Sequence, residues 1–142
     1  MRALLDVNVL LALMDSAHVH HGASLAWWRN ERDKGWASCP LTQNGFVRIV
    51  CQGKYPKRPT AAQAIEQLRL QLAEPGHEFW PDDVSIAEAA RFDRTHILGP
   101  KQISDVYLLA LAVKHSGRLV TFDRSIPLRA VHGAEPRHLV MI

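Results

Sequence analysis

The chain has few cysteines and no long apolar run, and both shortages restrict what it can be. Its only cysteines are Cys39 and Cys51, which do not form a CxxC or another metal-type spacing. This usage indicates a reducing compartment without a disulfide framework. No apolar stretch reaches the roughly 18 residues that a membrane span requires, and the first residues do not resemble a signal peptide. We therefore expect a cytoplasmic protein with no membrane partner.

An excess of one charge is also missing. The chain carries 17 Lys+Arg against 14 Asp+Glu, a net charge of +3 that does not by itself indicate nucleic-acid binding. His18, His20 and His21 lie close together, but no further Cys or His follows at zinc-ligand spacing. We favour a polar loop there over a zinc site. With 142 residues and no repeat or low-complexity segment, residues 1–142 are expected to form a single domain.

Short apolar segments alternate with longer amphipathic ones along the chain. Strands are predicted at residues 1–6, 36–39, 77–80, 118–123 and 139–142. Helices are predicted at residues 7–14, 20–34, 41–50, 60–73, 85–92 and 104–117. Thr42 and Ser104 are expected to cap two of these helices. The pattern predicts a three-layer α/β/α domain with a central, mostly parallel sheet of about five short strands.

Asp6 stands where the first predicted strand turns directly into a helix. No Gly, Pro or Ser separates the two apolar runs on either side of it. In open α/β sheets, ligands bind outside the carboxyl ends of the strands. Asp is also a preferred helix N-cap, so this residue alone is either a cap or part of a site.

Two further acids occupy corresponding positions. Asp123 follows the strand Leu-Val-Thr-Phe, and Asp105 lies in the first turn of the most apolar helix. Each acid separately could be a cap or could favour the positive end of a helix. Three carboxylates gathered at one sheet edge repel one another unless a cation lies between them. Mg²⁺ prefers such oxygen ligands, and a metal site of this kind suits phosphodiester hydrolysis.

Other polar residues are candidates for supporting roles. Asn8 would orient the Asp6 carboxylate, unless it simply faces solvent. Ser104 and Thr121 could hold a metal-bound water or an acid, although a helix cap and an ordinary strand residue are plainer interpretations. The Asp6-x-Asn8 spacing is similar to that of phosphotransferases with a nucleophilic Asp, but the second acid is replaced by Asn, which disfavours an aspartyl-phosphate mechanism.

A basic cluster lies in the middle of the chain. It is made of Arg48, Lys54, Lys57 and Arg58, with Tyr55 between them. Phosphate contacts to RNA would suit this cluster. A solvated loop is at least as good an interpretation.

Four segments resemble the PIN-domain family, and most closely the VapC toxins of bacterial toxin–antitoxin pairs. They are Leu-Leu-Asp6-Val-Asn8, Thr42-Gln43-Asn44-Gly45, Ile-Ser104-Asp105 and Leu-Val-Thr121-Phe-Asp123. They occur in the family order, and the similarity covers nearly the whole chain.

The resemblance implies a Mg²⁺- or Mn²⁺-dependent endoribonuclease that acts on RNA. It also implies a cognate antitoxin as partner and usually a homodimer. Asp6, Asp105 and Asp123 match the family's acidic positions. Gln43 stands where many members have Glu, and it adds an amide without a negative charge. A catalytically weak PIN fold that binds RNA or a protein is therefore the alternative expectation.

Overall fold

Five short strands form one parallel sheet in a computed structural model that describes all 142 residues. The strand order is β3-β2-β1-β4-β5. The strands are β1 (Ala3–Leu5), β2 (Trp36–Ser38), β3 (His77–Phe79), β4 (Arg118–Thr121) and β5 (Leu139–Met141). Every neighbouring pair in the sheet is parallel, so the predicted mostly parallel sheet of about five short strands is confirmed.

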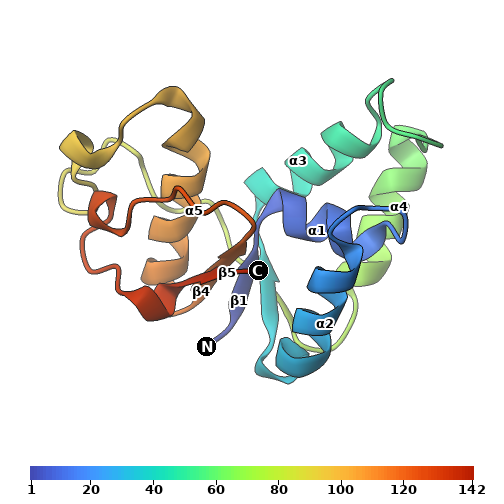
Figure 1. The fold of residues 1–142 in the computed structure, drawn as a ribbon, viewed down its shortest axis with the longest axis horizontal. Coiled ribbons are helices and arrows are strands. Elements are labelled where there is room, and N and C mark those ends of the chain that lie inside the picture. The colour runs from blue at the N-terminus through green and yellow to red at the C-terminus, as the bar shows by residue number, and fades with distance from the viewer.

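Helices cover both faces of this sheet. The helices are α1 (Val7–Met14), α2 (His21–Glu31), α3 (Pro40–Val50), α4 (Ala61–Leu72) and α5 (Ile103–Lys114). Figure 1 shows α1 to α4 on one side of the sheet, and α5 with the segments before and after it on the other. The arrangement is the predicted three-layer α/β/α fold. None of the helices combines the length and the apolar character needed to cross a membrane.

The two layers of core follow from alternation along the strands. Successive side chains of a strand point to opposite faces of a sheet. Leu4 and Leu119 pack into the core under α5. Leu5, Trp36 and Val120 pack into the core under α1, α3 and α4. Both faces are therefore apolar, as expected for a parallel sheet that is covered on each side.

The strand order reverses beside β1. The chain adds β2 and β3 on one side of β1 and then returns to place β4 on the other side. Such a reversal opens a crevice outside the carboxyl ends of the two strands where it occurs, because the connections leave in opposite directions. Here those strands are β1 and β4. The residues that follow them are the first place to look for a site.

Helices α1 and α3 approach each other closely near the same edge. A Cβ atom added to Gly45 would lie 2.7 Å from Cγ2 of Val7, the residue that follows Asp6. Gly45 is therefore tolerated inside α3 because it leaves room for α1. This contact places the first half of α3 beside the start of α1.

Three details of the predicted elements are wrong. Residues 85–92 form turns instead of a helix. The Ser85 N–H donates to the Glu88 side chain, as at the start of a helix, but the Ser85 hydroxyl accepts from Ala87 and Phe92 forms a β-bridge with Val131. Thr42 is not the N-cap of α3, because Pro40 already begins the helix and Thr42 bonds back to Cys39 from its first turn. Ser104 does not cap α5, which begins at Ile103.

The close approach of α1 and α3 can be tested by replacing Gly45 with Ala. Ala is ordinarily the better helix former by about 1 kcal/mol, but the new methyl group would overlap Val7, and such overpacking costs about 1–3 kcal/mol. We expect Gly45→Ala to lower the free energy of unfolding in urea. Gly22→Ala is the matched control, because nothing lies within 4 Å of its added Cβ in α2. A Gly45→Ala variant as stable as Gly22→Ala would contradict the close packing.

Candidate active site

The three predicted acids lie around the carboxyl edge of β1 and β4. Asp6 directly follows β1, and Asp123 follows β4 by two residues. Asp105 is the third residue of α5, a helix that packs on both strands. The charge of Asp123 acts on Asp6, and the charges of both act on Asp105. The fold therefore brings together three acids that are far apart in the sequence.

Asp6 is both a helix cap and a member of this acidic cluster, which we define as Asp6, Asp105 and Asp123. Its Oδ1 accepts a hydrogen bond of 2.7 Å from the backbone N–H of Val7 at the start of α1. Its Oδ2 accepts one of 2.7 Å from the Thr121 hydroxyl. Burial raises the pKa of Asp6, the two hydrogen bonds lower it, and the charge of Asp123 raises it further. The net direction is upward, so burial of this carboxyl outweighs its hydrogen bonds.

Thr121 connects the ends of β1 and β4 through its side chain. Its hydroxyl donates to Asp6, and the same oxygen accepts the backbone N–H of Asp123 at 3.0 Å. The residue is fully buried. A single hydroxyl thus fixes the distance between the turns that carry two of the acids.

Asp123 has the opposite electrostatic environment from Asp6. Its Oδ1 accepts hydrogen bonds from the Ser125 hydroxyl at 2.6 Å and the Ser125 backbone N–H at 2.7 Å. These bonds hold the pKa of Asp123 below its ordinary value, so it is the acid that stays ionised most readily. Ser125 was not among the predicted site residues. The Asp-x-Ser spacing, which is typical of a side chain bonding the backbone two residues on, was the signal that could have identified it.

Asp105 is the most strongly perturbed of the three. Burial raises its pKa to about 7, with further contributions from the charge of Asp6 and from hydrogen bonding and charge at Asp123. At neutral pH this carboxyl is therefore close to half protonated. Protonation of Asp105 removes one of the three negative charges from the cluster.

The remaining predicted residues are less closely joined to the acids. Asn8 and Ser104 are exposed, and no hydrogen bond joins the Asn8 side chain to Asp6. Gln43 lies in the first turn of α3, and its Nε2 donates to the Ser38 hydroxyl at 2.9 Å instead of to an acid. Ser38 is a further residue that the sequence did not single out.

The basic cluster is not part of the acidic edge. Arg48, Lys54, Lys57 and Arg58 are all exposed. They lie at the end of α3 and in the connection to α4, at the end of that helix that is farther from the sheet (Figure 1). Tyr55 turns away from them, because its hydroxyl donates to Asp15 at 2.6 Å.

The chemistry of the acidic cluster fits a divalent cation, although its side chains are not arranged as a finished site. No group of three or more His, Cys, Asp or Glu side chains has metal-ligand spacing. The mutual repulsion that contributes to the raised pKa of Asp105 is the effect that a bound cation would reverse. Carboxylate oxygens are the donors that Mg²⁺ and Mn²⁺ prefer. The residues present are therefore compatible with such an ion.

The fold and this edge define an α/β protein whose acidic cluster lies at the switch point of a parallel sheet. The chain belongs to the PIN domain family, whose model matches residues 3–131. Ribonuclease VapC44 from Mycobacterium tuberculosis is 52% identical over 142 residues, which cover all of both chains. The predicted resemblance to VapC proteins of this family is confirmed.

Solved structures show the same fold at low sequence identity. VapC20 from M. tuberculosis, described as a sarcin-ricin loop cleaving toxin, aligns with a TM-score of 0.63 at 14% identity, over 87% of this chain and 91% of that one. VapBC2 from Rickettsia felis, bound to a DNA fragment from its promoter, aligns with a TM-score of 0.58 at 14% identity, over 100% and 98% of the two chains.

Proposed function

We propose that this chain is a Mg²⁺- or Mn²⁺-dependent endoribonuclease and the toxin of a toxin–antitoxin pair. The observation that carries the proposal is the acidic cluster at the switch point, where burial and then the charges of its neighbours raise the pKa of Asp105 to about 7. The full-length similarity to Ribonuclease VapC44 supports RNA as the substrate. Cytoplasmic localisation stays a prediction from the sequence.

Asp6, Asp105 and Asp123 would hold the metal ion. When bound, the ion lowers the pKa of a coordinated water and stabilises the charge that develops on the scissile phosphate. Thr121 and the Val7 N–H keep the Asp6 carboxylate fixed at the end of β1. Ser125 keeps Asp123 ionised.

Asp105 is the titrating member of the cluster. With a pKa of about 7 it must release its proton to become a full ligand. RNA phosphates can be held by the basic cluster at the end of α3, through charge alone.

The second candidate function is a PIN fold that binds RNA or a protein without useful catalysis. Gln43 favours it, because by the family resemblance it stands where many members have Glu, and an amide adds no negative charge. Calorimetry separates the two candidates. Absence of Mg²⁺ and Mn²⁺ binding at millimolar metal, with RNA binding retained, would favour the binding module.

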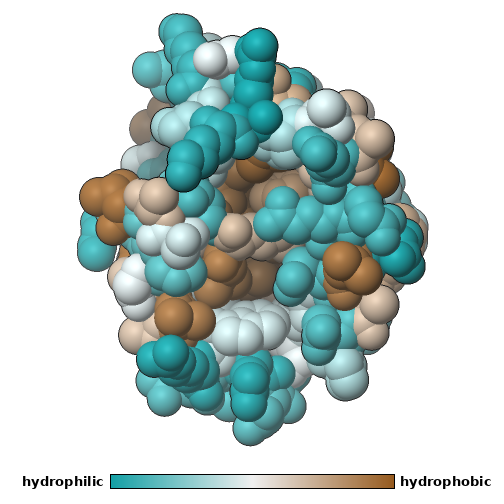
Figure 2. Space-filling model, turned by 90° about the vertical axis from the view of Figure 1, so that its right-hand side faces the viewer, coloured by the Kyte–Doolittle hydropathy of each residue, from teal (hydrophilic) through white to brown (hydrophobic).

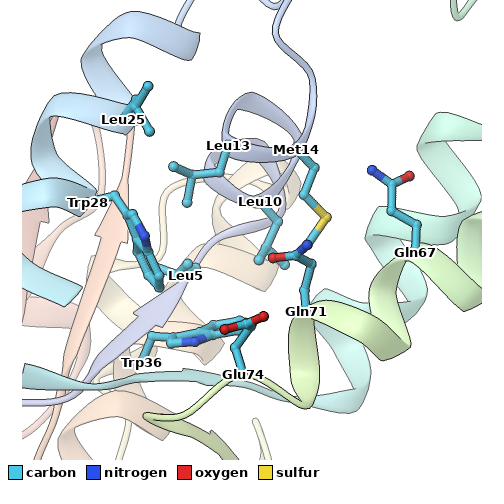
Figure 3. A pocket seen from close by; sticks show the side chains of 10 residues that line it. All are labelled: Leu5, Leu10, Leu13, Met14, Leu25, Trp28, Trp36, Gln67, Gln71 and Glu74. Carbon is cyan, nitrogen blue, oxygen red and sulfur yellow. The ribbon is translucent and has the colours of Figure 1, made fainter. Parts of the chain in front are cut away.

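An apolar hollow between α1, α2 and α4 offers a binding site for the antitoxin. Figure 2 shows brown, hydrophobic side chains at the bottom of a depression that is rimmed by polar residues. Figure 3 shows the side chains that line it, which come from β1, β2, α1, α2, α4 and the turn that follows α4. They are Leu5, Leu10, Leu13, Met14, Leu25, Trp28, Trp36, Gln67, Gln71 and Glu74. The hollow has a volume of about 280 Å³.

We propose that an apolar helix of the antitoxin occupies this hollow. Seven of its ten lining residues are hydrophobic, and four of these are only half-buried. A groove of this kind suits the apolar face of a partner helix. VapBC2, whose fold this chain shares, is a two-component assembly by its name. A homodimer is proposed on the family resemblance alone, and sedimentation equilibrium decides it.

Binding at the hollow should change tryptophan fluorescence. Trp28 and Trp36 line it, whereas Trp80 is buried in the other core. We expect the emission of this protein to shift when its cognate antitoxin is added, and the shift to shrink in Trp28→Phe. A complex that forms with no change in emission would place the antitoxin elsewhere.

The catalytic proposal is tested by RNA cleavage with purified protein. We expect cleavage to require Mg²⁺ or Mn²⁺, to stop in EDTA, and to fall by at least about 100-fold in Asp6→Asn and Asp105→Asn, since metal-bound charge stabilisation is worth several kcal/mol. Asp33→Asn is the control, because that carboxylate is 98% exposed and lies outside the cluster. Cleavage by both cluster variants at the wild-type rate would show that the site is misassigned.

A further inference from the structure

Gln43 is the end of a chain of hydrogen bonds that crosses three elements. Its Nε2 lies 2.9 Å from Oγ of Ser38, and the same Oγ lies 2.9 Å from Nε2 of His77. The three residues belong to α3, β2 and β3. Ser38 is fully buried, so its hydroxyl has no water to satisfy it and must use these two partners.

The direction of each hydrogen bond follows from the donors available. The backbone of Leu72 also acts on the His77 ring and raises its pKa, which favours a proton on Nδ1, the nitrogen that Ser38 does not contact. Burial lowers the pKa of His77, so the ring is neutral and its Nε2 is an acceptor. The Ser38 hydroxyl therefore donates its hydrogen bond to Nε2 of His77. Its oxygen then accepts a hydrogen bond from the amide nitrogen of Gln43.

This order of donors fixes which end of the Gln43 amide is free. The NH₂ group is held by Ser38, so the carbonyl oxygen Oε1 is the end without an assigned partner. Ser38, which holds the amide, is the last residue of β2, and β2 pairs with β1, which ends directly before Asp6. The Gln43 amide is thus held at the sheet edge on which Asp6 lies.

We propose that Ser38 and His77 are positioning residues that hold the Gln43 amide with its carbonyl oxygen free to serve the acidic cluster as a neutral acceptor. The proposal rests on the metal-dependent function proposed above. It gives Gln43 a defined role in place of Glu. An acceptor oxygen is retained, and the protein does not add a fourth negative charge to three acids that already repel one another.

A carboxylate at position 43 could not use the same chain of hydrogen bonds. It only accepts, so Ser38 would have to donate to it, and Ser38 would then need a proton from His77. Because the Leu72 contact already uses the Nδ1 proton, His77 would have to carry two protons. Gln43→Glu is therefore expected to raise the pKa of His77 through Ser38.

The charged groups around His77 are the same in every variant of this comparison. They are Arg2, which lowers the pKa of His77, and Glu78, which raises it and pairs with Arg2 at 2.9 Å. The backbone carbonyl of Glu74 accepts the His77 N–H. The ring also packs against Trp36, with centroids 4.4 Å apart. A shift that depends on Ser38 cannot arise from these neighbours.

Heteronuclear NMR of the histidine rings in metal-free protein tests the coupling. His77 is assigned by its loss in His77→Gln. We expect the wild-type ring to be neutral with its proton on Nδ1. In Gln43→Glu the pKa of His77 should rise, so that the midpoint of its titration moves to an at least tenfold lower proton concentration. In Ser38→Ala/Gln43→Glu most of this shift should vanish. An unchanged His77 in Gln43→Glu, or an equal shift without Ser38, would overturn the proposal.

A second readout tests the positioning role, and calorimetry with Mn²⁺ alone provides it. His77→Gln keeps an acceptor for the Ser38 hydroxyl, whereas His77→Leu removes it at similar size. We expect Ser38→Ala and His77→Leu to weaken Mn²⁺ binding severalfold, and His77→Gln to bind nearly as wild type. Equal affinities in all three variants would show that the chain of hydrogen bonds is only structural. Because the NMR test needs neither metal nor RNA, its failure is distinguishable from failure of the nuclease proposal.

Discussion

The carboxylate of Asp6 is the group through which the sheet, the first helix and the site are joined. One of its oxygens caps α1, and the other accepts the Thr121 hydroxyl from the end of β4. The backbone N–H of Asp6 also donates to Val120. The side chain is only 6% exposed, so these bonds are made where water competes little. A buried carboxylate with two good donors is tolerated, but it imposes its charge on everything nearby.

The electrostatics of the edge follow from that buried charge. The two hydrogen bonds from Ser125 stabilise the ionised form of Asp123, and its pKa falls. Asp105 has no comparable donors, and its own burial, followed by the charge of Asp6 and by hydrogen bonding and charge at Asp123, raises its pKa to about 7. Near neutral pH Asp105 is thus partly protonated, and a divalent cation would replace its proton. Gln43, with a neutral amide held by Ser38, adds no further repulsion.

Much of the fold could be predicted from the sequence, because it depends on local patterns. Apolar runs that end on Asp6 and Asp123 identified two strands and the edge to which they lead. The strand order could not be predicted, since it depends on which strands pair across long connections. The helix expected at 85–92 failed because the bridge between Phe92 and Val131 overrides a local capping signal. The hydrophobic periodicity of residues 85–92 cannot indicate a contact with a residue as distant in the sequence as Val131.

The three acids and Thr121 could be named from the sequence, but Ser125, Ser38 and His77 were not. Asp6, Asp105 and Asp123 could be selected as charges at element ends. Ser38 and His77 could not, because a Ser and a His inside short strands look like ordinary strand residues until β2 and β3 are paired. The signal at Gly45 was also ambiguous, since a helical Gly is explained only by the residue it contacts.

The central claim is that repulsion among the three acids is what a divalent cation would relieve. The most direct measurement is the pKa of the Asp105 carboxyl, followed by NMR in metal-free protein and again in saturating Mg²⁺. We expect a pKa of about 7 without metal and a pKa well below that value with Mg²⁺. A metal-free pKa near the ordinary value of 3.8, or a pKa that Mg²⁺ does not lower, would contradict the claim.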